Sequence, residues 1–324
     1  MKTFLTIPSI TFVKQCYYAI RKQSTLRLLA LVLPLGLSAA ETGKTFPTPE
    51  EAVAALVTAV GSQNTNALRE IFGPGADEIA NPDPVQAARE RSEFARALKQ
   101  FTNIQRESES RCVLEAGENH WPFPIPIVKR DGQWYFDAEA GREEILDRRI
   151  GKNELATLET LRACVEAERE YATHDHNGDQ VLEFAQKFIS TPGTQDGLYW
   201  PLGLDGETSP LGPLVANAQD LGYKHHPLEP EPSGEPFHGY FFKILTGQGK
   251  HAPGGKHSFL VNKNMLSGFA FVAWPAAYGD SGVMTFTVNQ QGRIYQKDLG
   301  PKTAKIARDM KEYDPDQTWH PSSD

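Results

Sequence analysis

An amphipathic stretch from about residue 153 to residue 172 constrains the fold most strongly. Apolar residues recur there at helical spacing, at Leu155, Leu158, Leu161 and Val165, with Glu and Arg between them. Such a helix is stable only when its apolar stripe packs against another element. Segments typical of strands follow it, at residues 240–245, 258–261, 268–274, 283–288 and 293–297. The pattern predicts an α+β fold in which one long helix packs on an antiparallel sheet.

A separate group of elements precedes this helix. Thr48-Pro49-Glu50-Glu51 is typical of a helix start, because Thr48 can cap the helix and proline suits its first position. Further helices are predicted at residues 66–72 and 85–101, and strands at residues 111–114, 121–129 and 133–137. Asp131-Gly132 predicts a tight hairpin turn. Prolines at alternate positions from 122 to 126 lack amide donors, so the strand over residues 121–129 is expected at an edge or on an irregular path.

Two domains are expected in the mature chain. Residues 138–152 are charged and contain two glycines, which favours a boundary between residues 41–140 and residues 141–324. After the long helix we expect a loop, a short helix and a second loop over residues 173–201. Residues 201–236 are rich in proline and favour an irregular excursion with one helix near residues 213–221.

The first forty residues have the order of a secretory signal peptide. Five basic and no acidic residues lead into the apolar run 28–37, and small residues follow at Ser38-Ala39-Ala40. The run is too short for a membrane-spanning helix, so we expect cleavage after Ala40; an uncleaved amphipathic anchor is the alternative. Removing residues 1–40 changes the net charge from −8 to −13, which argues against a nucleic-acid partner. We expect a periplasmic or secreted protein with no stable membrane span after cleavage.

Two cysteines remain after the predicted cleavage, because Cys16 lies within the signal peptide. In an oxidising compartment Cys112 and Cys164 could form a disulfide, and the alternative is two unpaired buried thiols. Neither a CxxC motif nor a Cys/His spacing typical of zinc sites is present.

One polar cluster could hold a metal ion. Asp175, Asn177 and Asp179 have the spacing of the first three ligands of an EF-hand loop, and Glu183 could supply a weaker ligand. Calcium is therefore a possible cofactor. The EF-hand match ends there, because Gln180 stands where that loop needs glycine and Gln186 where it needs glutamate. The alternative is an Asn-Gly turn that ends one helix and starts the next.

Catalytic motifs are weak. There is no G-x-S-x-G elbow, no S-x-x-K and no H-E-x-x-H. Ser281 lies in Gly-Asp-Ser-Gly, but a turn between two strands needs these residue types in any case. Aromatic residues gather in the second half, and some of them could form a recognition surface.

Each half also resembles a known class of domain. FPTPEEAVAALVTAV, NTNALREIFGP and GQWYFD resemble NTF2/cystatin-like domains, which implies a cone of helices on a curved sheet. NELATLETLRACVEAEREYA, HGYFFKILTG and GFAFVAWPAAYGDSGVMTFTVNQQGRIYQKDLG resemble the soluble part of type IV pilins and pseudopilins, which implies a long helix packed on an antiparallel sheet.

Longer motifs resemble one family across nearly the whole mature chain. RRIGKNELATLETLRACVEAEREYA, FISTPGTQDGLYWP, SPLGPLVA, VAWPAAYGDSGVMTF and KDLGP are similar to the bacterial DUF2950 family of unknown function. The resemblance implies an exported bacterial protein and implies no reaction.

We therefore expect an exported, non-enzymatic envelope protein with an interaction or assembly role and an envelope protein as partner. One alternative is a small-ligand-binding protein or hydrolase that uses the N-terminal cone pocket. An open pocket with an acidic or histidine side chain would favour that alternative, and a pocket filled by Phe94, Trp134 and Phe136 would favour a scaffold. A calcium-stabilised adhesion module is the other alternative.

Overall fold

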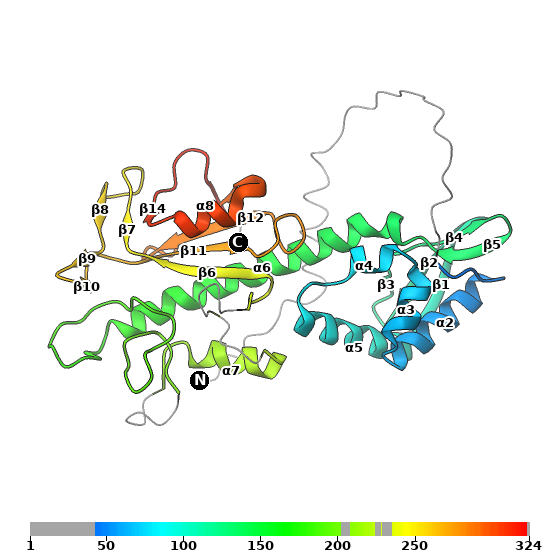
Figure 1. The fold of residues 1–324 in the computed structure, drawn as a ribbon, viewed down its shortest axis with the longest axis horizontal. Helices are drawn as coiled ribbons and strands as arrows, with labels where there is room; N and C mark the ends of the chain where they lie inside the picture. Colours follow the sequence, from blue (N-terminus) through cyan, green and yellow to red (C-terminus); the bar gives the residue numbers. More distant parts are fainter. Residues whose placement is uncertain (1–42, 202–207, 224–227, 229–234, 323–324) are drawn as a thin grey trace. The chain divides into compact units, whose positions relative to one another are not determined.

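The computed structural model describes residues 43–201, 208–223, 228 and 235–322. The predicted signal peptide of residues 1–40 lies outside the described residues. The described part combines helices with mainly antiparallel sheets, which confirms the α+β class (Figure 1). None of its helices carries an apolar stretch long enough to cross a bilayer.

Four helices begin the described chain: α2 (Pro49–Gly61), α3 (Thr65–Phe72), α4 (Gly75–Ile79) and α5 (Pro84–Gln100). The predicted cap of the first is confirmed, because the Thr48 side chain accepts a hydrogen bond from the Glu51 amide. Asn64 and Asp83 cap α3 and α5 in the same way. These caps satisfy amides that the first helical turn leaves without partners.

The N-terminal sheet contains β1 (Thr102–Ser108), β2 (Arg111–Ala116), β3 (Trp121–Pro122), β4 (Ile127–Arg130) and β5 (Gln133–Phe136). Its order is β1-β2-β4-β5, and β3 pairs with β2 off this path. Asp131 and Gly132 both have positive φ, which confirms the predicted hairpin turn. The irregular path expected for residues 121–129 is confirmed, because the segment with Pro124 and Pro126 interrupts the strand and separates β3 from β4. Strand β1 was not expected; its side chains are mostly exposed, which is why it shows no apolar pattern.

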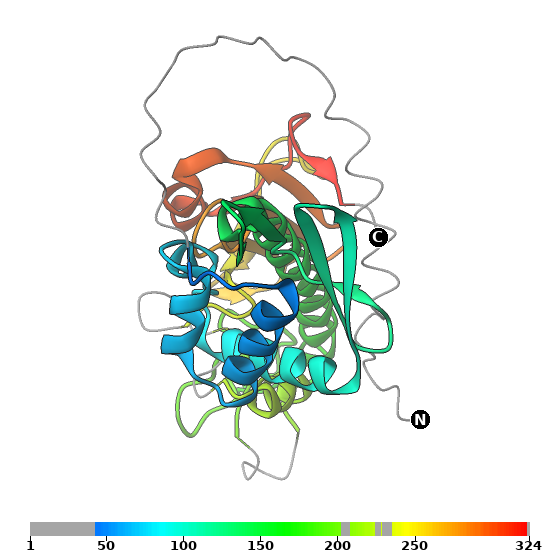
Figure 2. The same ribbon diagram turned by 90° about the vertical axis from the view of Figure 1, so that its right-hand side faces the viewer.

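Helices α2, α3 and α5 lie against the N-terminal sheet (Figure 2), and aromatic side chains belong to the apolar cluster of this half. Trp134 and Phe136 are buried, at 4% and 1% exposure. Phe94 stacks on Phe123, with ring centroids 4.9 Å apart. Phe94, Trp134 and Phe136, whose filling of the interior would favour a scaffold, therefore belong to or pack against one apolar cluster.

Helix α6 (Ala138–Tyr171) is longer than the sequence predicted. It begins at residue 138 rather than 153, and the Asp137 side chain caps it by accepting from the Ala140 amide. Within the charged segment, Arg148 and Glu144 form an i,i+4 ion pair of 2.8 Å, which supports a helix. Residues 138–152 are therefore helical. The division into domains at this segment stays a prediction.

The C-terminal sheet lies between two helices. Its order is β15-β13-β12-β11-β6, with β6 (Tyr240–Leu245), β11 (Ala270–Pro275), β12 (Met284–Asn289), β13 (Tyr295–Asp298) and β15 (His320–Pro321). All six residues of β11 are buried. Because successive side chains of a strand point to opposite faces, both faces of this strand are covered. Helix α6 packs on one face, and α8 (Thr303–Asp309), preceded by η2 (Gly300–Lys302), packs on the other (Figure 1).

Short elements complete the C-terminal half. They are α7 (Gly212–Leu221), the hairpin β9 (Leu260–Val261) and β10 (Asn264–Met265), and the sheet of β14 (Glu312–Tyr313), β7 (Gly247–Gln248) and β8 (His257–Ser258). The short helix expected within residues 173–201 is wrong, because this segment is irregular throughout. One of its residues, Phe184, instead bridges to Met265 of β10.

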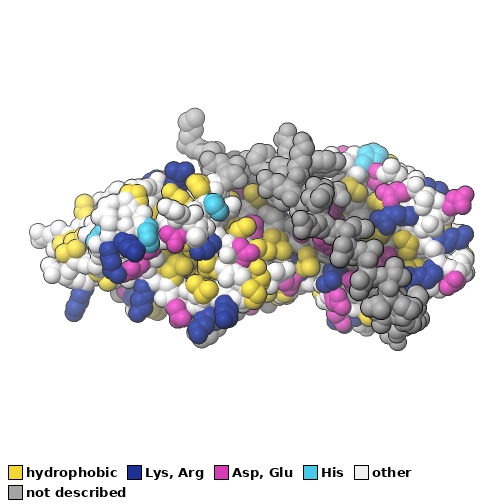
Figure 3. Space-filling view, turned by 90° about the horizontal axis from the view of Figure 1, so that it is seen from above, with side chains coloured by type: hydrophobic (Ala, Val, Ile, Leu, Met, Phe, Trp, Pro, Cys, Tyr) yellow, Lys and Arg dark blue, Asp and Glu magenta, His cyan; other side chains and the backbone are white. Residues whose placement is uncertain are grey.

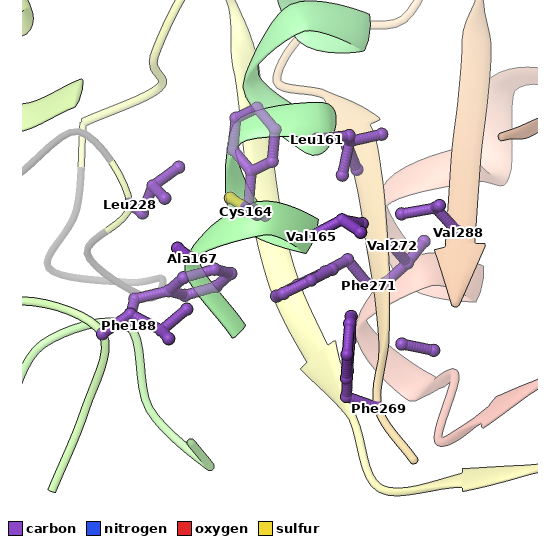
Figure 4. Packing of buried hydrophobic residues seen from close by; sticks show 14 of the residues in the cluster. Leu161, Cys164, Val165, Ala167, Phe188, Leu228, Phe269, Phe271, Val272 and Val288 are labelled. Atoms are coloured by element: carbon purple, nitrogen blue, oxygen red, sulfur yellow. The ribbon is translucent and has the colours of Figure 1, made fainter. Parts of the chain in front are cut away.

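The two cysteines lie in separate apolar clusters. Cys164 of α6 packs with Leu161, Val165 and Phe271 in the C-terminal cluster (Figure 4). Cys112 belongs to the N-terminal cluster. Both are fully buried and unpaired. Of the two alternatives for these residues, the structure has the unpaired buried thiols.

Thiol labelling checks this arrangement. We predict that iodoacetamide leaves Cys112 and Cys164 unmodified in the native protein, because burial raises the pKa of both thiols. In guanidinium without a reductant both should be alkylated, as in a reduced control, and mass spectrometry of the peptides measures this. A peptide in which Cys112 is linked to Cys164 would contradict the structure.

Candidate functional site

A buried arginine ties three distant parts of the chain together. Arg149 of α6 is 6% exposed, and its Nη2 donates to the carbonyl oxygens of Ile79 and Ala80 at 2.8 and 3.0 Å. Its Nη1 pairs with the carboxylate of Asp280, in the loop between β11 and β12. A guanidinium presents several donors in one plane, so a single side chain can serve both segments. Arg149 thereby joins the end of α4 to the β11–β12 loop.

A buried amide continues this network one turn along α6. Asn153 Nδ2 donates to the carbonyl oxygen of Ser281 at 2.9 Å, and its Oδ1 accepts from Gln86 Nε2 at 3.1 Å. The same Gln86 nitrogen lies 3.3 Å from Nδ1 of His238. We call this set of side chains the polar junction: Gln86, Arg149, Asn153, His238 and Asp280. It connects α5, α6 and the loops that flank the C-terminal sheet.

The histidine of the polar junction is neutral near physiological pH. Burial lowers the pKa of His238 to about 4, and the charges of Lys152 and Arg89 act in the same direction. The next residue, Gly239, has a φ of +74°, and a Cβ there would lie 2.6 Å from Asn153 Nδ2. The backbone therefore approaches Asn153 too closely for a larger residue.

The serine of the Gly-Asp-Ser-Gly motif closes its own turn. Ser281 is 2% exposed; its Oγ accepts from the Ala277 amide at 2.9 Å and lies 3.2 Å from the Ala277 carbonyl oxygen, to which it donates. Both hydrogen bonds are local to the loop. The turn interpretation of this motif therefore accounts for the side chain.

Two carboxylates of α6, the half-buried Glu154 and the buried Glu168, bind backbone amides. Glu154 Oε1 accepts from the amides of Val283 and Met284 at 3.0 and 2.9 Å. Glu168 is fully buried, and its Oε2 accepts from the Ala185 amide at 2.8 Å. Burial raises the pKa of both carboxyls. These contacts hold strand β12 and the irregular segment after α6 against the helix.

The predicted metal loop is organised by Asp175. Its Oδ1 accepts from the amides of Asn177 and Gly178, at 3.1 and 2.8 Å, and its Oδ2 accepts from the Gln180 amide at 2.7 Å. The Gln180 hydrogen bond is the main reason why the pKa of Asp175 is lowered. Three amides around one carboxylate are typical of a tight Asn-Gly turn.

The other predicted ligands also have protein partners. Asn177 Nδ2 donates to Glu183 Oε1 at 3.0 Å, and Asp179 Oδ2 accepts from Asn264 Nδ2 at 3.2 Å. The structure thus links Asn177 with Glu183, while Asp179 turns toward the β9–β10 hairpin. Among the described residues, no group of three or more His, Cys, Asp or Glu side chains is placed to hold a metal ion. The calcium site stays a prediction.

Apolar side chains are uncovered beside this loop. Leu182, Val261 and Leu266 are 58%, 43% and 39% exposed, three of the four exposed large hydrophobic residues in the described chain. Val261 pairs with Asn264 across the hairpin, and the Phe184 amide donates to the Met265 carbonyl oxygen at 2.9 Å, so the three apolar residues belong to adjoining segments. We call Leu182, Val261 and Leu266 the hairpin surface.

Sequence reasoning missed the hairpin surface. It expected one strand over residues 258–261, whereas the chain reverses at Asn262 and Lys263, which both have positive φ. Asparagine is one of the residues that tolerates this conformation, so Asn262-Lys263 between two apolar pairs was the available signal.

Two depressions of the surface lie outside the aromatic interior of the N-terminal half. One of about 380 Å³ lies between α2 and α3, with Lys44, Glu70 and small or polar side chains in its wall. Another of about 520 Å³ lies between α5 and the end of α7, with Arg89 and Glu235 in its wall. Arg89 pairs with Glu93 at 2.8 Å.

Removing the central arginine should weaken the fold. We predict that Arg149→Met lowers the free energy of unfolding by about 1.5–3 kcal/mol, because two carbonyls and Asp280 lose a charged donor. Urea unfolding measures the effect. The control is Arg142→Met, which removes an exposed pair with Glu139 and should change stability by at most about 1 kcal/mol. An equal loss of unfolding free energy in the two variants would contradict the predicted contribution of Arg149 to stability.

The predicted calcium ligands have a separate test. If Asp175, Asn177, Asp179 and Glu183 bind calcium, millimolar calcium raises the Tm, because a ligand of the native state stabilises it. Asp179→Ala should abolish the rise, and magnesium serves as the control ion. An unchanged Tm in calcium would contradict the predicted site.

Comparison with protein-family models gives one match. Residues 43–321 match a family described as "Protein of unknown function (DUF2950)". No curated protein matches the chain, and no solved structure matches it either. The resemblance of each half to NTF2/cystatin-like domains and to pilins stays a prediction. Because the family match covers nearly all of the described residues, the chain belongs to the DUF2950 family.

Proposed function

We propose that this chain is an exported, non-enzymatic envelope protein with an interaction or assembly role, in the periplasm or outside the cell. The order of residues 1–40, basic and then apolar and then small, supports export. The net charge of −13 for residues 41–324 favours protein partners over nucleic acid.

The hairpin surface carries the interaction role. Soluble domains bury most large apolar side chains, and groups of exposed ones mark contact sites more often than single ones do. Leu182, Val261 and Leu266 come together from two segments that are far apart in the sequence. Covering them with a partner would remove apolar surface from water at no cost to the internal contacts.

The hydrogen bonds that the polar side chains form with other parts of the chain support a non-enzymatic role. The residues most reminiscent of hydrolase chemistry are Ser281, which is buried, and His238, which is half-buried, and both are engaged in the contacts described above. Glu154 and Glu168 bind backbone amides. A catalytic group must reach a substrate, whereas these groups contact neighbouring segments of the chain.

Pull-down from a native envelope fraction tests the proposal. We predict that the protein recovers a specific partner and that a variant with Leu182→Ser, Val261→Ser and Leu266→Ser recovers at least tenfold less. The reason is that each serine removes apolar surface from the contact. Quantitative mass spectrometry measures the recovery, with and without calcium.

The matched control is Ile306→Ser on α8, since Ile306 is 40% exposed and lies on a different element. It should recover the partner as the unmodified protein does. Circular dichroism establishes that the variants are folded. Recovery of nothing above background, or equal recovery by the triple variant, would contradict the proposal.

A further inference from the structure

Helix α6 presents a face with two exposed acidic side chains and two half-buried apolar ones. Glu143, Leu146, Asp147 and Ile150 recur at helical spacing and so share one side of the helix. Glu143 and Asp147 are exposed, and Leu146 and Ile150 are half-buried without belonging to either apolar cluster. We call these four residues the α6 face.

The charges of the α6 face lack compensation. Glu143 and Asp147 are four residues apart, a spacing at which like charges repel. Neither forms an ion pair with any residue that the structure describes. The pKa of Asp147 is raised, first by partial burial and then by the charges of Glu143 and Glu144. A cation placed against this face would relieve the repulsion.

Helix α8 presents the opposite combination. Lys302, the last residue of η2, and Lys305 and Ile306 of α8 are exposed, whereas Thr303 and Ala307 of the same helix are buried. Ile306 is 40% exposed. Lys302 and Lys305 are exposed and make no ion pair within the described chain. We call Lys302, Lys305 and Ile306 the α8 face.

The stretch of sequence that contains the α8 face is also basic. Residues 236–311 contain ten basic and three acidic residues, in a chain with a net charge of −8. Lys and Arg side chains are spread over the left-hand part of the surface in Figure 3. Burial lowers the pKa of Lys243, and the charge of one of the three acids, Asp309, opposes this lowering. Lys243 donates to the carbonyl oxygens of Arg308 and Met310.

We propose that the α8 face of one molecule docks on the α6 face of a second copy of this chain. Each face has an apolar centre with charges beside it, and the two charge signs are opposite. Four residues of α-helix separate Glu143 from Asp147 by about 6 Å along the axis, and Lys302 and Lys305 are separated by about 5 Å. The charges can therefore pair while Ile306 contacts Leu146 and Ile150.

This contact is head-to-tail, because the two faces are different surfaces of the same chain. Such an interface leaves one unused face at each end of a pair and permits further addition. The surfaces are small, so the association is reversible and salt-sensitive rather than obligate. The inference rests on the assembly role proposed above and adds to it a self-association that is separate from the envelope partner of the hairpin surface.

Sedimentation velocity of the purified protein, with its N-terminus identified by intact mass, tests the contact. The apparent mass of the sedimenting protein should rise with protein concentration at low ionic strength. It should fall toward the mass of the monomer at high ionic strength. Lys302→Glu with Lys305→Glu should raise the Kd of self-association at least tenfold, and so should Glu143→Lys with Asp147→Lys. The control is Lys99→Glu with Glu109→Lys, exposed charges on other elements, which should associate as the unmodified protein does.

Mixing the variants distinguishes this geometry from a general charge effect. Each double variant alone should stay monomeric, and an equal mixture should regain association, because the intact α6 face of one variant meets the intact α8 face of the other and the two substituted faces are complementary as well. All four substitutions in one chain should restore self-association, because the charges are then exchanged. A monomer at every concentration, or association unaffected by the substitutions, would overturn the proposal.

Binding of the α8 face to anionic vesicles is the alternative to its binding to a second copy. Co-sedimentation of a monomeric protein with phosphatidylglycerol vesicles, lost in Lys302→Glu with Lys305→Glu, would assign the α8 face to lipid and overturn the second-copy contact. The proposed function fails separately, since it depends on recovery of an envelope partner through the hairpin surface. A monomer that still recovers that partner would refute only the self-association.

Discussion

The structure depends on one continuous helix that serves two apolar clusters. Ile145 of α6 packs against the N-terminal cluster, and Leu158, Leu161 and Val165 lie in the C-terminal one. Between them, Arg149 is buried and binds two carbonyls and a carboxylate. A buried charge is tolerated only when its donors are used, so this contact requires α4 and the β11–β12 loop to meet the helix at one point.

That requirement explains why the buried polar groups bind other elements of the chain and stabilise the fold. Gln86, Asn153 and Ser281 bond to one another across elements separated by many residues. Apolar packing tolerates small shifts in register, whereas a buried amide that loses its partner carries a desolvation penalty. The polar junction therefore selects one arrangement of α5, α6 and the loops, and the groups that look catalytic in the sequence are used in that selection.

Features that depend on neighbouring residues were predicted correctly from the sequence. Contacts between residues far apart in the sequence were not predicted. The cap at Thr48 and the turn at Asp131-Gly132 depend on neighbouring residues and were predicted correctly. Residues 138–152 looked like a linker because Arg149 is a charge without a visible partner, and its partners lie about 70 and 130 residues away in the chain. The four predicted metal ligands were near in sequence, yet Asp179 bonds to Asn264 of the distant hairpin.

The hairpin surface and the α8 face are exposed to solvent, whereas the polar groups discussed above bind other parts of the chain. A net charge of −8 makes two copies repel at long range, but at physiological ionic strength this repulsion is screened beyond about 8 Å. Contacts between complementary groups act within that distance. An acidic protein can thus stay dispersed in solution and still associate through a local basic face. The α8 face and the hairpin surface are then two separate proposed contact surfaces, one basic and one apolar.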